Sequence, residues 1–294
     1  MPELPEVEAV RRALQPVMER ARFESVVTRR PDLRAPFPPR FAARLHGQIV
    51  QHLRRRAKYL LAELSSSETL VMHLGMSGSF QIEAAGSNDT PGAFYFERAE
   101  PGRHDHVVFG MSSGATVTFN DPRRFGFMDL LSPSQLATHP VLSRLGPEPL
   151  GAEFDAAALA DALKTKKTSL KTALLDQRVV AGLGNIYVCE ALHRARLSPR
   201  RRASSIATRT GAPRDPAIRL VAATKRVIEN AVKRSLVWQQ KDEAGARADL
   251  TSFPYRFRVY DREGSRCLRA GCGGIVKRIV QMGRSTFYCA RCQR

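Results

Sequence analysis

The sequence predicts an α+β protein, in which an N-terminal antiparallel β-sandwich domain with flanking helices precedes a helical domain and a cysteine-bearing β-hairpin. Three observations predict this fold class. Short segments rich in β-branched and aromatic residues, separated by Gly, Pro and Ser, fill the N-terminal part, as in an antiparallel sandwich or barrel. Apolar residues then recur at three- and four-residue spacing, which is typical of amphipathic helices. Four cysteines follow in two close pairs near the C-terminus.

The N-terminal part is expected to contain one helix followed by strands. The helix covers the run from Pro5 to Leu14, with Pro5 suited to its first turn and acidic residues near the positive end of its dipole. The strands are expected at residues 23–30, 48–53, 59–64, 69–73, 78–83, 106–110 and 116–120. The Gly- and Pro-containing stretch 84–103 indicates a surface insertion.

The C-terminal part changes to a helical period. Helices are expected at residues 154–164, 169–176, 185–194 and 216–236, and an alternating β pattern returns from residue 251. We therefore expect four parts: a sandwich domain at 1–132, a proline-containing inter-domain hinge at 133–153, a helical domain at 154–250 and a zinc finger at 251–294.

The composition indicates a polyanionic partner. The chain has 294 residues, with 47 Lys and Arg against 28 Asp and Glu, a formal net charge of +19 and a pI near 10.6. A ribosomal or membrane-surface protein would share this charge. No run approaches the roughly 18 apolar residues of a membrane span, and the amino terminus lacks the pattern of a signal peptide. A cytoplasmic protein is therefore expected.

The cysteine spacing predicts one structural zinc ion. Four residues separate Cys267 from Cys272, two separate Cys289 from Cys292, and sixteen lie between the pairs. Two close thiol pairs bracketing a hairpin-length segment suit a closed tetrahedral site. A pair of disulfides is the alternative, which a cytoplasmic location disfavours. Cys189 falls on an apolar helix face and is expected to be a buried thiol.

The first residues offer an unusual nucleophile. Aminopeptidases remove an initiator Met before a residue as small as Pro, which would leave Pro2 with a free secondary amine. Its pKa would lie near the α-amino range, so that the unprotonated amine is available near neutral pH. Such an amine attacks electrophilic carbon and forms an iminium. The alternative is a capped helix start at a frayed terminus.

A glycine-containing turn at Gly182 and Gly184 indicates a phosphate site. A dinucleotide-binding loop is disfavoured, because Tyr187 replaces the third glycine and no βαβ unit surrounds the segment. Asn185 is expected to begin a helix whose free N–H groups attract an anion. A simple helix cap is the alternative.

The start of the chain, Met1-Pro2-Glu3-Leu4-Pro5-Glu6-Val7-Glu8, is very similar to that of bacterial formamidopyrimidine-DNA glycosylases. The resemblance extends over nearly the whole chain. It includes the blocks RAKYL at 56–60, HLGMSG at 73–78, NDPRRFG at 120–126 and GRSTFYC at 283–289. The segment 174–187 resembles the helix–two-turns–helix motif of this family, and the cysteines resemble its terminal zinc finger.

The resemblance implies an enzyme that excises oxidised purines and then cuts the abasic strand by β,δ-elimination. It implies Pro2 as the Schiff-base nucleophile, Glu3 as proton donor and acceptor, and Glu6 as a residue that orients the nucleophile. Lys58 and Arg284 would contact phosphate and donate protons during elimination.

The resemblance also implies residues that open the duplex. A base must leave the stack before an enzyme can act on it, and something must fill the vacated space. Met76, Arg123 and Phe125 suit this role, although residue type alone favours core packing for Met76 and Phe125. The other expected DNA contacts are His104, Arg124, Lys171 and Asn185.

We therefore expect a bifunctional DNA glycosylase and lyase of base excision repair. Its partner would be duplex DNA with damaged bases or abasic sites, and it would act as a monomer in the bacterial cytoplasm, associated with the nucleoid. Two alternatives are a non-cleaving zinc-finger protein of this fold and an endonuclease VIII-like enzyme for oxidised pyrimidines. Leu4 and the Arg123-Arg124-Phe125 block favour the purine branch.

One block departs from the family pattern. Relatives carry glycines and a basic residue before a mobile loop over the flipped base, whereas this chain has Val232, Lys233 and Val237 there, followed by Trp238. Rigid residues restrict a lid, and Val237 supplies no charged hydrogen bond. We expect the segment 232–255 to weaken the preference for 8-oxoguanine over formamidopyrimidines.

Overall fold

The structure is a computed structural model that describes residues 2–84, 87–89, 102–239 and 257–294. The chain forms two compact units. Unit 1 comprises Met1–Ser143 and Arg234–Phe253, and unit 2 comprises Arg144–Lys233 and Pro254–Arg294. Each unit is described by itself.

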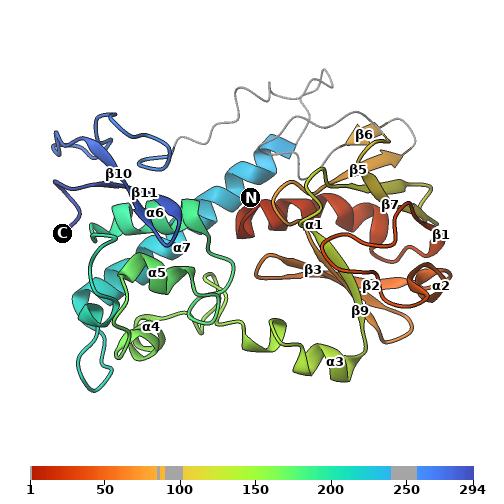
Figure 1. Ribbon diagram of the computed structural model, residues 1–294, viewed down its shortest axis with the longest axis horizontal. Helices are drawn as coiled ribbons and strands as arrows, with labels where there is room; N and C mark the ends of the chain where they lie inside the picture. The colour runs from red at the N-terminus through yellow and green to blue at the C-terminus, as the bar shows by residue number, and fades with distance from the viewer. Residues whose placement is uncertain (1, 85–86, 90–101, 240–256) are drawn as a thin grey trace. The chain divides into compact units, whose positions relative to one another are not determined.

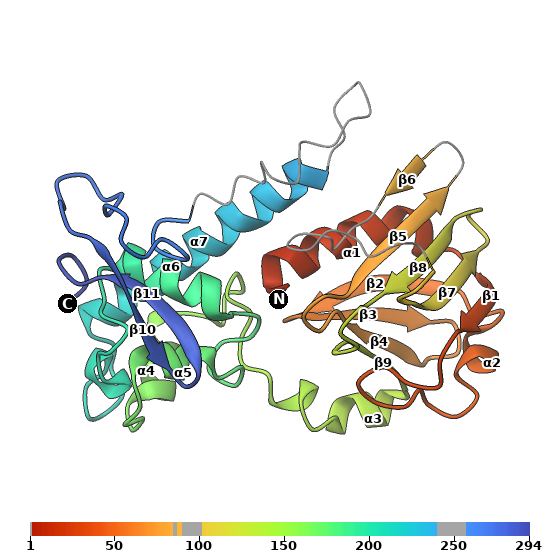
Figure 2. The same cartoon turned by 45° about the horizontal axis from the view of Figure 1, so that its top comes forward.

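Unit 1 is built on two antiparallel sheets (Figures 1 and 2). The first has the order β1 (Phe23–Thr28), β7 (Asp105–Met111), β8 (Thr116–Asn120), β5 (Ser79–Ala84) and β6 (Ser87–Asp89). The second has the order β2 (Val50–Arg56), β3 (Tyr59–Leu64), β4 (Thr69–His73) and β9 (Phe127–Leu131). Side chains from both sheets form one buried core, which confirms the predicted fold class for this part.

Helix α1 (Leu4–Met18) packs against β2 and closes this core. Val7, Val10, Leu14 and Met18 recur at three- or four-residue spacing, and all four side chains are buried. Pro5 lies in the first turn, where its missing N–H costs no hydrogen bond. The helix continues past Leu14, the limit expected from the sequence, because this apolar face extends to Met18.

Several short elements of unit 1 were not expected. They are β6, β9, α2 (Phe41–Leu45) and α3 (Pro133–Thr138). Helices of five or six residues carry too few turns for a periodic pattern to show. The start of α3 nevertheless has a local signal, because Ser132 accepts from the Gln135 N–H while the Gln135 side chain accepts from the Ser132 N–H.

Unit 2 is helical with a terminal hairpin, as predicted. Its elements are α4 (Ala156–Leu163), α5 (Leu170–Leu175), α6 (Asn185–Ala195), η2 (Ala203–Ile206), β10 (Val276–Gln281) and β11 (Arg284–Cys289). The short helix η1 (Leu142–Arg144) spans the boundary between the units, and α7 (Asp215–Gln239) belongs to unit 2 up to Lys233. The unit boundary at Ser143 falls within the expected hinge 133–153, and the division into four parts stays a prediction.

The hairpin is joined to α6 by a buried carboxylate. Glu190 accepts the backbone N–H groups of Arg258, Val259 and Tyr260 at 2.9, 2.9 and 3.0 Å. Cys189 beside it packs with Val259 and the hairpin residues Val276 and Phe287, which confirms the expected buried thiol. One turn of α6 therefore fixes the chain that leads into the hairpin.

Among the described helices, none combines the length and the apolar composition needed to cross a membrane.

Substitution of Glu190 tests whether its carboxylate attaches residues 258–260 to α6. Glu190→Gln should lower the free energy of unfolding by about 1–3 kcal/mol, because a neutral amide with one acceptor oxygen replaces a charged acceptor of three N–H groups. Chemical denaturation of the zinc-loaded protein measures this change. Glu153→Gln, at an exposed position of the same unit, serves as the control. Equal stability of the two variants would contradict the assignment.

Candidate functional site

The amino terminus of α1 is a buried, fixed structure. Pro2 and Glu3 precede the helix, Glu3 is 2% exposed and Glu6 is fully buried. The Glu3 N–H donates to the Glu6 carboxylate at 2.9 Å, and the Val7 N–H donates to the Glu3 carbonyl at 3.0 Å. Glu6 therefore holds the backbone next to Pro2, and the alternative of a frayed terminus is disfavoured.

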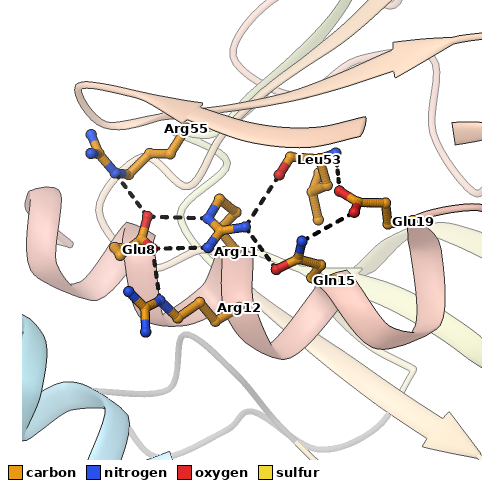
Figure 3. A network of polar contacts seen from close by, with 7 residues as sticks. All are labelled: Glu8, Arg11, Arg12, Gln15, Glu19, Leu53 and Arg55. Atoms are coloured by element: carbon orange, nitrogen blue, oxygen red, sulfur yellow. Dashed lines mark hydrogen bonds and ion pairs between the residues drawn. The ribbon is translucent and has the colours of Figure 1, made fainter. Parts of the chain in front are cut away.

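A second carboxylate anchors α1 to the sheet (Figure 3). Glu8 accepts from Arg11 at 3.0 Å and Arg12 at 2.8 Å on its own helix, and from Arg55 Nε of β2 at 3.2 Å. Burial raises the pKa of Glu8, but the hydrogen bonds from Arg11 and Arg12 outweigh it and hold the pKa below the usual value. Glu8 is therefore ionised and links the start of α1 to the end of β2.

Arg55 also holds the turn that carries Lys58. Ala57 and Lys58 form the two-residue connection between β2 and β3, because Arg56 pairs with Tyr59. Ala57 has a φ of 53°, a left-handed conformation that disfavours a residue with a Cβ. Arg55 Nη1 donates to the Ala57 carbonyl at 2.9 Å and supports this turn. Arg55 thus joins α1, which follows Pro2 and Glu3, to the turn that carries Lys58.

His73 is a residue of this region that the sequence analysis did not single out. Its Nδ1 accepts the Gly75 N–H at 3.0 Å, and its ring stacks on Phe127 at 5.6 Å between centroids. Burial, followed by the charge of Lys58, lowers the pKa of His73 to about 4. The imidazole is therefore neutral at pH 7, consistent with Nδ1 acting as an acceptor. Its place in the HLGMSG block was the only available signal.

Two loops of unit 1 are packed backbone against backbone. A Cβ on Gly75, whose φ is +62°, would lie 2.3 Å from the carbonyl carbon of Phe125. The buried carboxylate of Asp121 joins the loops, since it accepts from Ser77 Oγ at 2.5 Å and from the Gly126 N–H at 2.8 Å. The loop that carries Met76 is therefore fixed to the loop that carries Phe125.

The exposure of Met76 and Phe125 disfavours the alternative that their side chains belong to the core. Phe125 is 42% exposed, and Met76 is partly exposed. Arg123 lies over the Phe125 ring, with Cζ at 4.7 Å from the centroid. The structure therefore brings an exposed aromatic ring and a guanidinium together, and Met76 lies on the loop fixed to theirs.

Arg124 and His104 flank these loops. Arg124 Nη1 lies 3.6 Å from the Asp32 carboxylate, and a cavity of about 510 Å³ is lined by residues 32–34 and 123–125. His104 is partly exposed, and its carbonyl accepts the Asp121 N–H at 3.0 Å. The Arg124 N–H also donates to the Asp121 carbonyl at 3.1 Å, so both residues are tied to the network around Asp121.

In unit 2 the tip of the hairpin is attached to the first turns of α5 and α6. The Ser285 carbonyl accepts from Asn185 Nδ2 at 2.9 Å and from Lys171 Nζ at 3.3 Å, and Lys171 also donates to Thr286 Oγ1 at 2.6 Å. Arg284, the first residue of β11, is exposed beside these contacts. The structure therefore brings Asn185, Lys171 and Arg284 together.

The placement of Lys171 nevertheless differs from the expected phosphate contact. Its side chain is fully buried, and its ammonium group bonds the hairpin. Lys171 therefore positions the strand that begins at Arg284 and does not face solvent. This role depends on residues more than a hundred positions away, which no local pattern reveals.

Gln177 shapes the glycine turn and was also missed. Its side chain donates to the Leu183 carbonyl at 2.8 Å and accepts the Gly182 N–H at 2.9 Å. Gly182 has a φ of +83°, which favours glycine, and Gly184 is the N-cap of α6. Gln177 thereby fixes the approach to Asn185.

The four C-terminal thiols fit a tetrahedral zinc ion. The Sγ atoms of Cys267 and Cys292 are 3.9 Å apart, those of Cys272 and Cys289 are 3.6 Å apart, and all four lie within 4.8 Å of one another. A tetrahedron with Zn–S bonds of about 2.3 Å places its sulfurs roughly 3.8 Å apart. Four thiolates leave no coordination position for water, so the site is structural.

His193 contacts this site from α6. Its Nε2 lies 3.3 Å from Cys267 Sγ, and its side chain is fully buried. Burial and then the charge of Arg269 lower the pKa of His193 to about 4. A neutral imidazole donates one N–H, which here can stabilise a ligand thiolate.

Comparison with known sequences accounts for the whole chain. Residues 1–128 match the model of the formamidopyrimidine-DNA glycosylase N-terminal domain, residues 145–240 that of the formamidopyrimidine-DNA glycosylase H2TH domain, and residues 264–294 that of a zinc finger found in FPG and IleRS. The formamidopyrimidine-DNA glycosylases of Bradyrhizobium sp. and Azorhizobium caulinodans are 60% and 57% identical over 294 residues, with 100% of each chain covered.

Solved structures agree with this result. The crystal structure of the MutM (Fpg) protein from Thermus thermophilus is 36% identical, with a TM-score of 0.77, and the match covers 99% of this chain and 98% of that chain. The Lactococcus lactis Fpg in complex with abasic-site DNA is 27% identical, with a TM-score of 0.79 and 100% of both chains covered.

Because His193 contacts Cys267 Sγ, we predict that the protein binds zinc less tightly when the imidazole is removed. His193→Phe keeps an aromatic ring but removes the N–H at the Cys267 sulfur, so zinc affinity should fall roughly 10- to 100-fold. Competition with a chromophoric chelator measures the affinity. The exposed His46→Phe is the matched control, and equal zinc retention by both variants would exclude a role for the contact.

Proposed function

The chain belongs to the formamidopyrimidine-DNA glycosylase family, and we propose that Pro2, freed by removal of Met1, is the nucleophile of its glycosylase and abasic-site lyase reactions. The observation that carries this proposal is the buried start of α1, where the bond from the Glu3 N–H to Glu6 fixes the residue next to Pro2. A nucleophile at a chain terminus requires this restraint, because termini otherwise fray.

In the proposed reaction the Pro2 nitrogen attacks C1′ of an everted, damaged nucleotide. The bond from C1′ to the base breaks, the departing base takes a proton, and an iminium joins Pro2 to the opened sugar. Glu3 exchanges protons at the sugar ring. Loss of the C2′ proton then expels the 3′ phosphate, and a second elimination expels the 5′ phosphate.

Lys58 and Arg284 are the proposed proton donors for these two eliminations and contact phosphates of the same strand. Lys58 is 8% exposed on the turn held by Arg55. Arg284 is exposed at the head of β11. A lysine ammonium and an arginine guanidinium both pair with phosphate oxygens, which supports the assignment.

The substrate is proposed to be duplex DNA with a damaged base or an abasic site. Solved relatives from Lactococcus lactis were crystallised with abasic-site DNA and with DNA containing Fapy-dG. Met76, Arg123 and Phe125 are proposed to fill the space left by the everted nucleotide, since the exposed ring and guanidinium sit on fixed loops. We further propose that the protein acts as a monomer on the DNA of the bacterial nucleoid, in the cytoplasm.

The expected effect of the segment 232–255 on lesion choice stays a proposal. Residues Val232–Gln239 form the last turns of α7, so the departure from the family pattern falls in a helix. Residues 240–256 lie outside the described part of the chain. Glycine destabilises a helix interior relative to other residues, so Val232 and Lys233 favour the helical conformation of this segment more than glycines would.

The decisive test of Pro2 uses one protein before and after cleavage. A tag that ends in a protease site directly before Pro2 makes its nitrogen an amide. We expect borohydride to trap no covalent adduct with abasic duplex before cleavage, and full trapping after it, with duplex binding present in both states. Equal trapping by the uncleaved protein would refute the assignment.

The position of Lys58 can be tested through Arg55. Arg55→Gln removes the contacts with Glu8 and the Ala57 carbonyl, so strand cleavage of an abasic duplex should slow roughly ten- to a hundredfold in single turnover, with binding retained. Arg55→Lys, which keeps one donor, should recover part of the rate. The matched control is Arg54→Gln, whose ion pair with Glu63 is exposed. A rate equal to this control would contradict the positioning role.

A further inference from the structure

Three adjoining cavities in unit 2 are lined chiefly by arginine. The largest, of about 530 Å³, lies beside the zinc ligands Cys272 and Cys292, and two others measure about 350 and 280 Å³. They adjoin because they share Arg194, Arg196, Arg219 and Arg269. Together they are lined by the arginine group, defined as Arg194, Arg196, Arg201, Arg219, Arg226, Arg258, Arg269, Arg291 and Arg294.

Local structure accounts for part of this charge. Arg269 and Arg219 donate to carbonyls at the C-terminal end of α6, at 2.6 Å to His193 and 3.0 Å to Ala195, where the helix dipole favours cations. A zinc ion bound by four thiolates carries two negative charges, which the nearby guanidinium groups also balance.

Carboxylates of the described residues pair with only part of this charge. Among the described residues, ion pairs reach two members of the group: Arg219 pairs with Asp215 at 2.8 Å and Arg226 with Glu229 at 3.9 Å. These two carboxylates and the zinc tetrathiolate offset four of the nine guanidinium charges. The Nε of Arg269 is in addition buried without a hydrogen-bond partner. About half of the positive charge therefore has no carboxylate or thiolate partner within the described part of the chain.

This surface is distinct from the proposed DNA contact in unit 2. Asn185 begins α6, whereas Arg194 and Arg196 lie at its other end. Eleven helical residues separate the two ends by roughly 16 Å. The arginine group is thus not an extension of the contact formed by Asn185 and Arg284.

The chemistry of the cavity lining favours carboxylates over single-stranded nucleic acid. Single strands are held by stacking on aromatic rings, and none of the residues lining these cavities is aromatic. Aspartate and glutamate side chains can enter, and the guanidinium fork pairs with carboxylates in two-bond geometry. Leu197, Ala222 and Ala223 add apolar wall.

We propose that the arginine group binds an acidic peptide segment of a partner protein. The segment would present several Asp or Glu side chains, with apolar residues between them, to the end of α6 and the base of the zinc hairpin. Binding there leaves Asn185 and Arg284 accessible, so the partner and damaged DNA would be held at the same time. This inference is independent of Pro2 and of the proposed reaction.

The test measures binding of a fluorescein-labelled decapeptide of alternating Glu and Leu to the zinc-loaded, full-length protein by fluorescence anisotropy. Arg196→Glu/Arg291→Glu changes two exposed members of the arginine group, and its Kd should rise at least tenfold. Arg209→Glu/Arg214→Glu makes the same charge change at exposed positions of unit 2 outside the cavities, and its Kd should stay within twofold of wild type. The affinity for an abasic duplex should be the same in all three proteins.

Three results would overturn the proposal. The first is equal peptide binding by the two double variants, which would show general attraction to a basic protein. The second is a parallel loss of abasic-duplex binding in Arg196→Glu/Arg291→Glu, together with displacement of the peptide by duplex, which would assign the cavities to DNA. The third is unchanged peptide affinity in Arg196→Gln/Arg291→Gln. This milder variant is used if charge reversal reduces the zinc content. Borohydride trapping, measured in parallel, reports separately on Pro2.

Discussion

The ion pair between Glu8 and Arg55 is the interaction on which the proposed active site depends. A nucleophile at the end of a chain has bonds on one side only, so the protein must restrain it through the element that follows. Glu8 supplies this restraint by joining α1 to β2 at 3.2 Å, and Arg55 passes it to the turn of Lys58 through the Ala57 carbonyl. Helix, strand and turn are thereby set relative to one another by two side chains.

In unit 2, too, polar contacts of a few side chains join separate elements of the fold. There a single carbonyl, that of Ser285, accepts from both Asn185 and Lys171, and so joins the hairpin to two helices near Arg284. At the other end of the hairpin, Glu190 and the zinc thiols hold its base. In both units the exposed groups proposed to meet DNA are short extensions from a rigid, internally bonded support.

The sequence predicted what is encoded locally. Signals within a few residues predicted the strands of unit 1 other than β6 and β9, the helices with a continuous apolar face, the paired cysteines and the motifs around Pro2 and Lys58. Two kinds of feature were not predicted. Elements such as α2 are too short for a period to appear, and other features depend on a partner that is distant in sequence. Lys171 belongs to the second kind, because its burial is set by Thr286, 115 positions later. Asp121, Gln177 and His193 were missed since an isolated polar residue carries no sign of what it will contact.

The zinc hairpin has a consequence for the chemistry of the cell in which the protein works. Oxidised purines arise under oxidative stress, and cysteine thiolates are themselves targets of oxidants. Oxidation of one of the four ligands would release the metal and, with it, the folding energy of the segment that presents Arg284. The capacity to repair oxidative damage is thus coupled to the redox state of the repair protein. Burial of Cys289 and the near-complete burial of Cys267 and Cys272 slow this loss by limiting access to the sulfurs.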